Sequence, residues 1–111
     1  MYQDKVVLCG SSSYSKLFYL NPDFDNLPQD VKDQLKIMCV YFTEKVGGSL
    51  MLEYDDEGNL EFSVSANEAD AMFDEIGSAL EIKKLQAEER EFLESLELYY
   101  KVFFLNTDEE L

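Results

Sequence analysis

The amino-acid sequence predicts a single α+β domain in which a four-stranded antiparallel sheet, made of two hairpins, carries helices packed on one face. A length of 111 residues corresponds to one domain, which we expect to span residues 1–111. Hydrophobic residues make up 46% of the chain and aromatic residues 14%, which is enough material for a core. Short apolar runs bounded by turn residues are followed by helical stripes, in the order β-β-α-β-β-α-(α).

The first two strands are predicted at residues 5–9 and 14–20. The first is a short apolar run that stops at the Gly-Ser-Ser-Ser segment 10–13, which is typical of a turn. The second is rich in aromatic residues, which favour strands, and it stops at Asn21-Pro22. We expect the two strands to form a hairpin.

The first helix is predicted to begin at Pro28 and to end at Gly47-Gly48. Proline is tolerated in a first helical turn, and glycine commonly follows the last one. Between these limits apolar side chains recur every three or four residues, at Val31, Leu35, Met38, Phe42 and Val46.

The second hairpin is predicted at residues 49–54 and 60–65. Both segments alternate between apolar and mostly polar side chains, which indicates strands with one buried face. The turn between them, residues 55–59, is acidic and contains Gly58, which can adopt a positive φ.

The C-terminal segment 67–105 is predicted to be helical, with Asn67 as its N-cap. A straight helix of this length would span roughly 55–60 Å, which is too long for a small domain. The segment must therefore bend at Gly77-Ser78, split near Ala87-Glu88, or project and pair with a second chain. Residues 106–111 are expected to form a frayed tail.

The chain is strongly acidic and contains no histidine. Its 24 acidic residues face 9 basic ones, so the net charge is −15. Without histidine, most hydrolase triads and zinc sites are excluded, and we expect no catalysis and no cofactor. The charge repels nucleic acid and anionic membranes, and no apolar run approaches the roughly 18 residues of a membrane span. We therefore expect a cytoplasmic protein in which Cys9 and Cys39 are buried free thiols.

Five segments carry a resemblance to a known family. They are Lys5-Val-Val-Leu-Cys-Gly, Tyr19-Leu-Asn-Pro-Asp-Phe-Asp-Asn-Leu-Pro, Thr43-Glu-Lys-Val-Gly-Gly, Phe73-Asp-Glu-Ile-Gly and Leu98-Tyr-Tyr-Lys-Val. In these segments the chain resembles an uncharacterised family of small acidic bacterial proteins, a domain of unknown function found mostly in Gram-positive anaerobes. The resemblance implies a stand-alone cytoplasmic protein and transfers no catalytic residues.

Acidic side chains crowd the tip of the second hairpin and are candidate ligands for a hard cation. The candidates are Glu53, Asp55, Glu57 and Glu61. An alignment with an EF-hand loop on Gly58 places three of them at ligand positions, but Val64 stands where a bidentate glutamate is required. The sequence therefore favours an ordinary acidic turn, with weak calcium or magnesium binding as the alternative.

The last helical segment carries an apolar stripe that is a candidate partner-binding surface. The stripe consists of Leu85, Phe92, Leu96, Tyr99 and Phe103. It could pack within the monomer, or against a partner or a second copy. The aromatic run exceeds what a four-stranded sheet needs to cover one face, which favours a homodimer that shares the stripe.

Three functions follow from these patterns. The leading hypothesis is a non-catalytic cytoplasmic interaction protein that binds an unknown protein partner through its acidic surface, its apolar C-terminal helix, or both. The first alternative is a small metal-binding protein or enzyme that uses the carboxylates of the 53–61 hairpin. The second is a ligand-binding domain with an aromatic pocket formed by Tyr14, Phe18, Tyr19, Phe24 and Tyr41.

Overall fold

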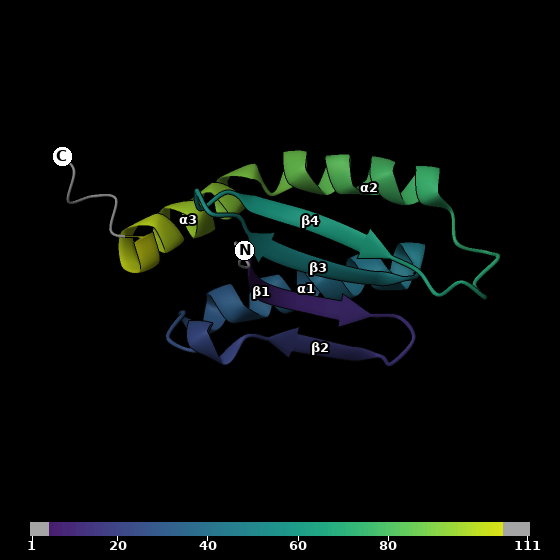
Figure 1. Cartoon of the computed structure of the whole chain (residues 1–111), viewed down its shortest axis with the longest axis horizontal. Helices are drawn as coiled ribbons and strands as arrows, with labels where there is room; N and C mark the ends of the chain where they lie inside the picture. The colour runs from purple at the N-terminus through teal and green to yellow at the C-terminus, as the bar shows by residue number, and fades with distance from the viewer. Residues whose placement is uncertain (1–4, 106–111) are drawn as a thin grey trace.

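The computed structural model describes residues 5–105 and confirms the predicted α+β architecture (Figure 1). The four strands form one antiparallel sheet in the order β2-β1-β3-β4. The strands are β1 (Val6–Ser12), β2 (Leu17–Leu20), β3 (Ser49–Tyr54) and β4 (Leu60–Ser65). The helices are α1 (Gln29–Val46), α2 (Glu75–Glu88) and α3 (Arg90–Tyr100), with a 3-10 turn at Pro22–Phe24 and a π-helical turn at Lys101–Leu105.

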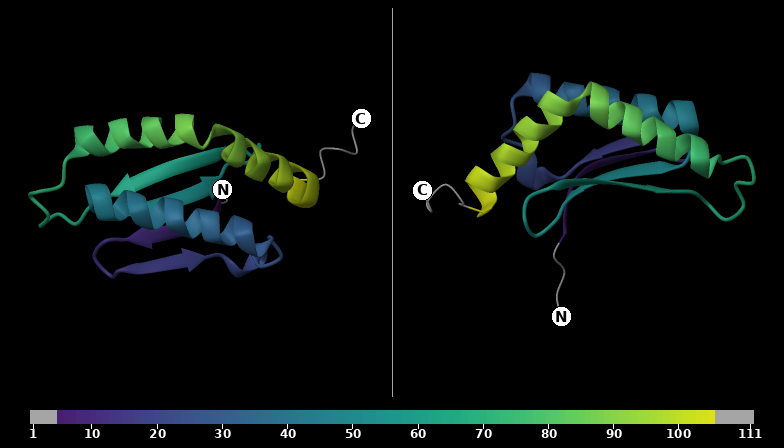
Figure 2. Two further views of the ribbon diagram at one scale, coloured as in Figure 1. Left: turned by 180° about the vertical axis from the view of Figure 1, so that it is seen from behind. Right: turned by 90° about the horizontal axis from the view of Figure 1, so that it is seen from above.

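The three α-helices all lie over the same face of the sheet, as the view from above shows (Figure 2). The core fills the space between the two layers, and it includes Leu50, Leu52 and Tyr54 of β3. The pairing of β1 with β3 shifts by one residue between Val7 and Cys9, which is a β-bulge. Because of this bulge, the consecutive residues Leu8 and Cys9 are both fully buried.

The first strand is longer than predicted, because the Gly-Ser-Ser-Ser segment does not begin the turn at Gly10. At Gly10 the backbones of β1 and β3 approach closely, and a Cβ there would lie 2.9 Å from the carbonyl oxygen of Leu50. The Ser11 hydroxyl is buried, donates to the carbonyl oxygen of Cys39 at 2.9 Å, and lies 3.2 Å from the Thr43 hydroxyl. The small residues thus continue the strand and attach it to α1, and β2 is correspondingly shorter than predicted.

The predicted helical start at Asn67 is wrong, because α2 begins at Glu75. Asp74 is its N-cap and accepts a hydrogen bond of 2.9 Å from the backbone N of Gly77. The backbone N of Asn67 instead donates to the Tyr14 hydroxyl at 3.1 Å, which ties this segment to the turn between β1 and β2.

The C-terminal segment divides into two helices at Glu89, next to the second of the two predicted break points. Glu89 accepts a hydrogen bond of 3.1 Å from the side chain of Gln34 on α1, and α3 continues in a new direction over the sheet (Figure 2). Among residues 5–105, no helix combines the length and the apolar character that crossing a membrane requires. The predicted frayed tail lies outside the described residues.

Candidate functional site

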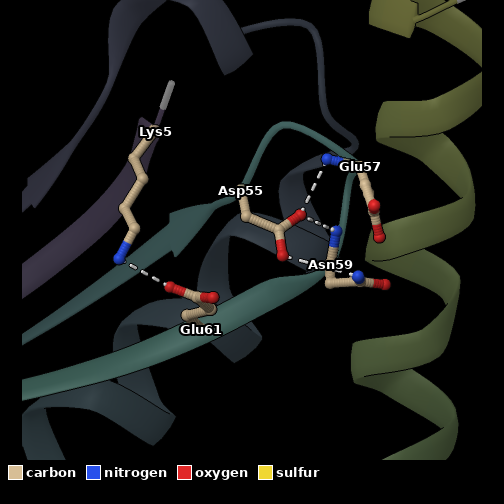
Figure 3. A network of polar contacts seen from close by, with 5 residues as sticks. All are labelled: Lys5, Asp55, Glu57, Asn59 and Glu61. Carbon is tan, nitrogen blue, oxygen red and sulfur yellow. Dashed lines mark hydrogen bonds and ion pairs between the residues drawn. The ribbon is translucent and has the colours of Figure 1, made fainter. Parts of the chain in front are cut away.

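The hairpin tip uses the Asp55 carboxylate to close its own turn (Figure 3). Oδ1 of Asp55 accepts hydrogen bonds of 2.9 Å from the backbone N of Glu57 and from the backbone N of Asn59. Oδ2 of Asp55 accepts a longer bond of 3.4 Å from the Asn59 side chain. The bond from the Asn59 backbone is the main cause that lowers the pKa of Asp55, because it stabilises the ionised carboxylate.

The other predicted metal ligands do not converge on Asp55. The Glu61 carboxylate lies 2.8 Å from Nζ of Lys5, and this hydrogen-bonded contact raises the pKa of Lys5. The Glu57 side chain points away from both Asp55 and Glu61 (Figure 3). Within the described residues, no three histidine, cysteine, aspartate or glutamate side chains come together as metal ligands. The geometry therefore offers calcium or magnesium no preformed site at this tip.

The predicted partner stripe is divided between the core and the surface. Leu96 is buried, while Leu85, Phe92 and Tyr99 are half-buried against the core. Phe103 is exposed, with 68% of its surface accessible. Most of the stripe therefore stabilises the monomer, and Phe103 is the member that a partner could reach.

Sequence reasoning missed two residues of the buried side of α3. Leu93 and Tyr100 join Leu96 there. The Tyr100 ring stacks on Tyr54 with ring centroids 4.0 Å apart, and Phe104 stacks on Tyr100 at 4.9 Å. The spacing of 93, 96 and 100 is itself helical, so the signal was present in the sequence beside the stripe that we chose.

The five aromatic residues proposed for a ligand pocket lie in different places. Phe24 is fully buried and stacks on Tyr54, and Phe18 is half-buried against the core. Tyr14 lies at the turn after β1 and donates to Asp70 at 2.6 Å. Tyr41 is exposed on α1, whereas Tyr19 is exposed on the opposite face of the sheet.

That opposite face is a surface that the sequence analysis did not identify. No helix of residues 5–105 covers it (Figure 2), and we call it the open face. Strand alternation assigns to it the residues Val7, Gly10, Ser12, Leu17, Tyr19, Ser49, Met51, Glu53, Glu61, Ser63 and Ser65.

The open face is hollowed at Gly10, which contributes no side chain. Gly10 lies opposite Tyr19 on one neighbouring strand and opposite Met51 on the other. Tyr19 and Met51 are 55% and 40% exposed, and Leu17 on the same face is 70% exposed. These side chains and the nearby serines surround a shallow hollow of about 360 Å³.

Comparison with known proteins places the chain in a family without an assigned activity. No curated protein and no solved structure matches the chain. The family model described as a family of unknown function (DUF6145) matches residues 5–108, which is nearly the whole chain. The protein therefore belongs to this family of unknown function.

Proposed function

We propose that this chain is a non-catalytic interaction protein of the bacterial cytoplasm that binds a protein partner on its open face. The observation that carries the proposal is the exposure of Leu17, Tyr19 and Met51 on sheet strands whose other face packs against the helices. Large exposed apolar patches on soluble proteins mark sites of interaction with other molecules. The lack of histidine, the commonest general base, supports a role in binding rather than catalysis.

The rigidity and shape of the open face distinguish it from the other exposed apolar residues. Tyr19 and Met51 extend from paired strands and flank a hollow at Gly10, so a partner side chain can enter between them. Ile76 and Leu80 of α2 are also exposed, at 75% and 63%. A hollow of about 710 Å³ adjoins Ile76, but polar and acidic residues such as Asn67, Asp70 and Asp74 line much of it. The α2 pair therefore serves as the matched control.

The C-terminal helix and the acidic surface contribute differently to this proposal. Phe103, in the π-helical turn after α3, is the exposed member of the predicted stripe, and Leu98 is exposed on α3 itself, so this end of the molecule offers a small apolar contact. The net charge of −15 acts at longer range and accelerates the approach of a basic partner.

A small apolar ligand is the second candidate occupant, because the hollow of about 360 Å³ falls within the range of ligand pockets. Such pockets usually enclose most of the ligand surface. The hollow is open to solvent along the sheet, which favours a protein segment over a small molecule.

Affinity purification with variants tests the proposed function. Tyr19→Thr combined with Met51→Thr removes the apolar walls and keeps the charge, while threonine favours strands. Ile76→Gln combined with Leu80→Gln removes a similar apolar area on α2. We expect partners recovered with the wild-type chain to be retained by the α2 variant and lost by the open-face variant. Equal recovery with the open-face variant, shown by circular dichroism to be folded, would contradict the proposal.

A further inference from the structure

The side chains of the open face form three rows across the strands, and only one row is charged. Tyr19, Gly10, Met51 and Ser63 form the central row, and Leu17, Ser12, Ser49 and Ser65 form an uncharged row on one side of it. The third row, on the other side, consists of Val7, Glu53 and Glu61. The face is therefore uncharged over most of its length, with apolar side chains at Leu17, Tyr19 and Met51, and it is acidic at the end next to the hairpin tip.

The charged row brings two carboxylates of like charge into direct opposition. Glu53 and Glu61 are cross-strand partners in the antiparallel ladder of β3 and β4. Like charges in this arrangement are destabilising. Lys5 forms an ion pair with Glu61 and also interacts electrostatically with Glu53, so one cation faces two carboxylates. A second cation placed beside Glu53 would relieve the remaining repulsion.

We infer that the open face binds a protein segment with apolar side chains over Gly10 and a cluster of lysine or arginine side chains beside Glu53. This inference rests on the proposed function and specifies the chemistry and the orientation of its partner. The segment lies along the strands, with its basic end at the hairpin tip, because the carboxylates occupy that end alone. The turn residues Asp55 and Asp56 extend the negative potential beyond the sheet at the same end.

A second copy of the chain fits this face less well than a basic partner. Each copy carries a net charge of −15, so two copies repel each other as they approach. A basic segment instead neutralises charge on contact, and electrostatic complementarity of this kind fixes both specificity and orientation.

Synthetic peptides test the inference by fluorescence anisotropy. The probe is a labelled peptide of about twelve residues that alternates valine and threonine and ends in a cluster of lysines, which matches the pleat of a strand. In two counterparts the lysines are replaced by glutamine or by glutamate. We expect the lysine peptide to bind about tenfold more tightly than the glutamine peptide, and the glutamate peptide not to bind.

Two pairs of charge variants locate the basic end of the probe. The double variant Glu53→Gln with Glu61→Gln should lower the affinity for the lysine peptide about tenfold and leave the affinity for the glutamine peptide unchanged. Glu88→Gln with Glu91→Gln removes the same charge from exposed positions on the helical layer and should have little effect on either peptide. Equal weakening by both pairs would mean nonspecific attraction to the acidic protein, and it would overturn the inference.

The remaining outcomes separate the inference from the proposed function. If the lysine and glutamine peptides bind equally and both need Tyr19 and Met51, the charge inference is wrong and the proposed function stands. If the lysine peptide fails to bind, the inference is also overturned. If binding does not depend on Tyr19 and Met51, both proposals fail. If sedimentation shows a dimer that Tyr19→Thr with Met51→Thr separates into folded monomers, a second copy occupies the open face.

Discussion

The Tyr54 hydroxyl donates a hydrogen bond of 2.9 Å to the carbonyl oxygen of Leu96 and so joins β3 to α3. The two residues are buried, and the Tyr54 ring also stacks on Tyr100. Burial is the main cause that raises the pKa of the Tyr54 phenol, because the charged form is disfavoured away from water. The hydroxyl therefore stays protonated and keeps donating at neutral and mildly alkaline pH.

Removal of this hydroxyl should destabilise the protein modestly. Tyr54→Phe keeps the aromatic stack and loses the hydrogen bond, so we expect the free energy of unfolding to fall by about 1 kcal/mol. Tyr19→Phe removes a hydroxyl from the exposed open face and should change the free energy of unfolding by less than about 0.5 kcal/mol. Urea denaturation followed by circular dichroism measures both values. Equal losses in the two variants would show that the bond to Leu96 contributes nothing to stability.

The Asp55 carboxylate should contribute to stability through the turn that it closes. Asp55→Ala removes the acceptor for the backbone N–H groups of Glu57 and Asn59, and we expect a loss of about 1 kcal/mol at pH 7. Asp56→Ala, at the exposed neighbouring position, should have little effect on the same denaturation curve. A larger loss for Asp56→Ala than for Asp55→Ala would contradict this role.

The same carboxylate gives the stability a defined dependence on pH. The hydrogen bonds hold the pKa of Asp55 in the folded protein below its ordinary value of 3.8. Its contribution is therefore fully present above the ordinary pKa and is lost as the pH falls through the lower pKa of the folded state. Asp55→Asn should reduce the slope of unfolding free energy against pH in the acid range, and a slope identical to wild type would exclude the effect.

The paired thiols of Cys9 and Cys39 should resist chemical modification in the folded protein. Both side chains are fully buried, and their sulfur atoms lie 3.8 Å apart. The hydrogen bond with Cys39 and burial both raise the pKa of Cys9, so little reactive thiolate forms. We expect a colorimetric thiol reagent to label the native protein slowly and to label the urea-unfolded protein at once. Immediate labelling of the native protein would show that the thiols are accessible.

Substitution by glutamate should destabilise the protein on the buried side of the C-terminal helical segment but not on its exposed side. Phe92→Glu with Tyr99→Glu places charges against the core, and we expect the unfolding free energy to fall by roughly 2–5 kcal/mol. Phe103→Glu changes an exposed position and should leave stability within about 0.5 kcal/mol of wild type.

Analytical ultracentrifugation of the same proteins tests the predicted homodimer. A native dimer that Phe103→Glu converts into folded monomers would support an interface at the C-terminal helical segment.

Local patterns were sufficient to predict the second hairpin and the order of the elements. Residues 49–54 and 60–65 alternate regularly, and Gly58 adopts a φ of +87° in the turn between them. Local patterns failed where a distant residue decided the structure. Ser11 looked like a turn residue but bonds to α1, and the backbone N of Asn67, the predicted N-cap, donates to Tyr14, 53 positions earlier in the chain.

The candidate sites were harder to predict, because periodicity does not show which stripe faces the core. Phe92 and Leu93 are neighbours on helical stripes that overlap, but Leu93 is buried whereas Phe92 is only half-buried. The open face was missed for a related reason. The predicted packing of helices on one face left the side of Met51 open, but alternation could not show the strand order that places Gly10 between Tyr19 and Met51.

The hairpin tip should bind calcium and magnesium only weakly, in the millimolar range or above. Asp55 already accepts hydrogen bonds within its turn, and Glu61 is paired with Lys5, so a cation must compete with both sets of contacts. Calorimetric titration with each ion measures the affinity directly. Asp55→Asn with Glu57→Gln is the variant that removes the nearest ligands, and Glu88→Gln with Glu91→Gln is the control of equal charge. Micromolar affinity that the first variant abolishes and the second retains would make the carboxylates of this hairpin the principal site of the protein.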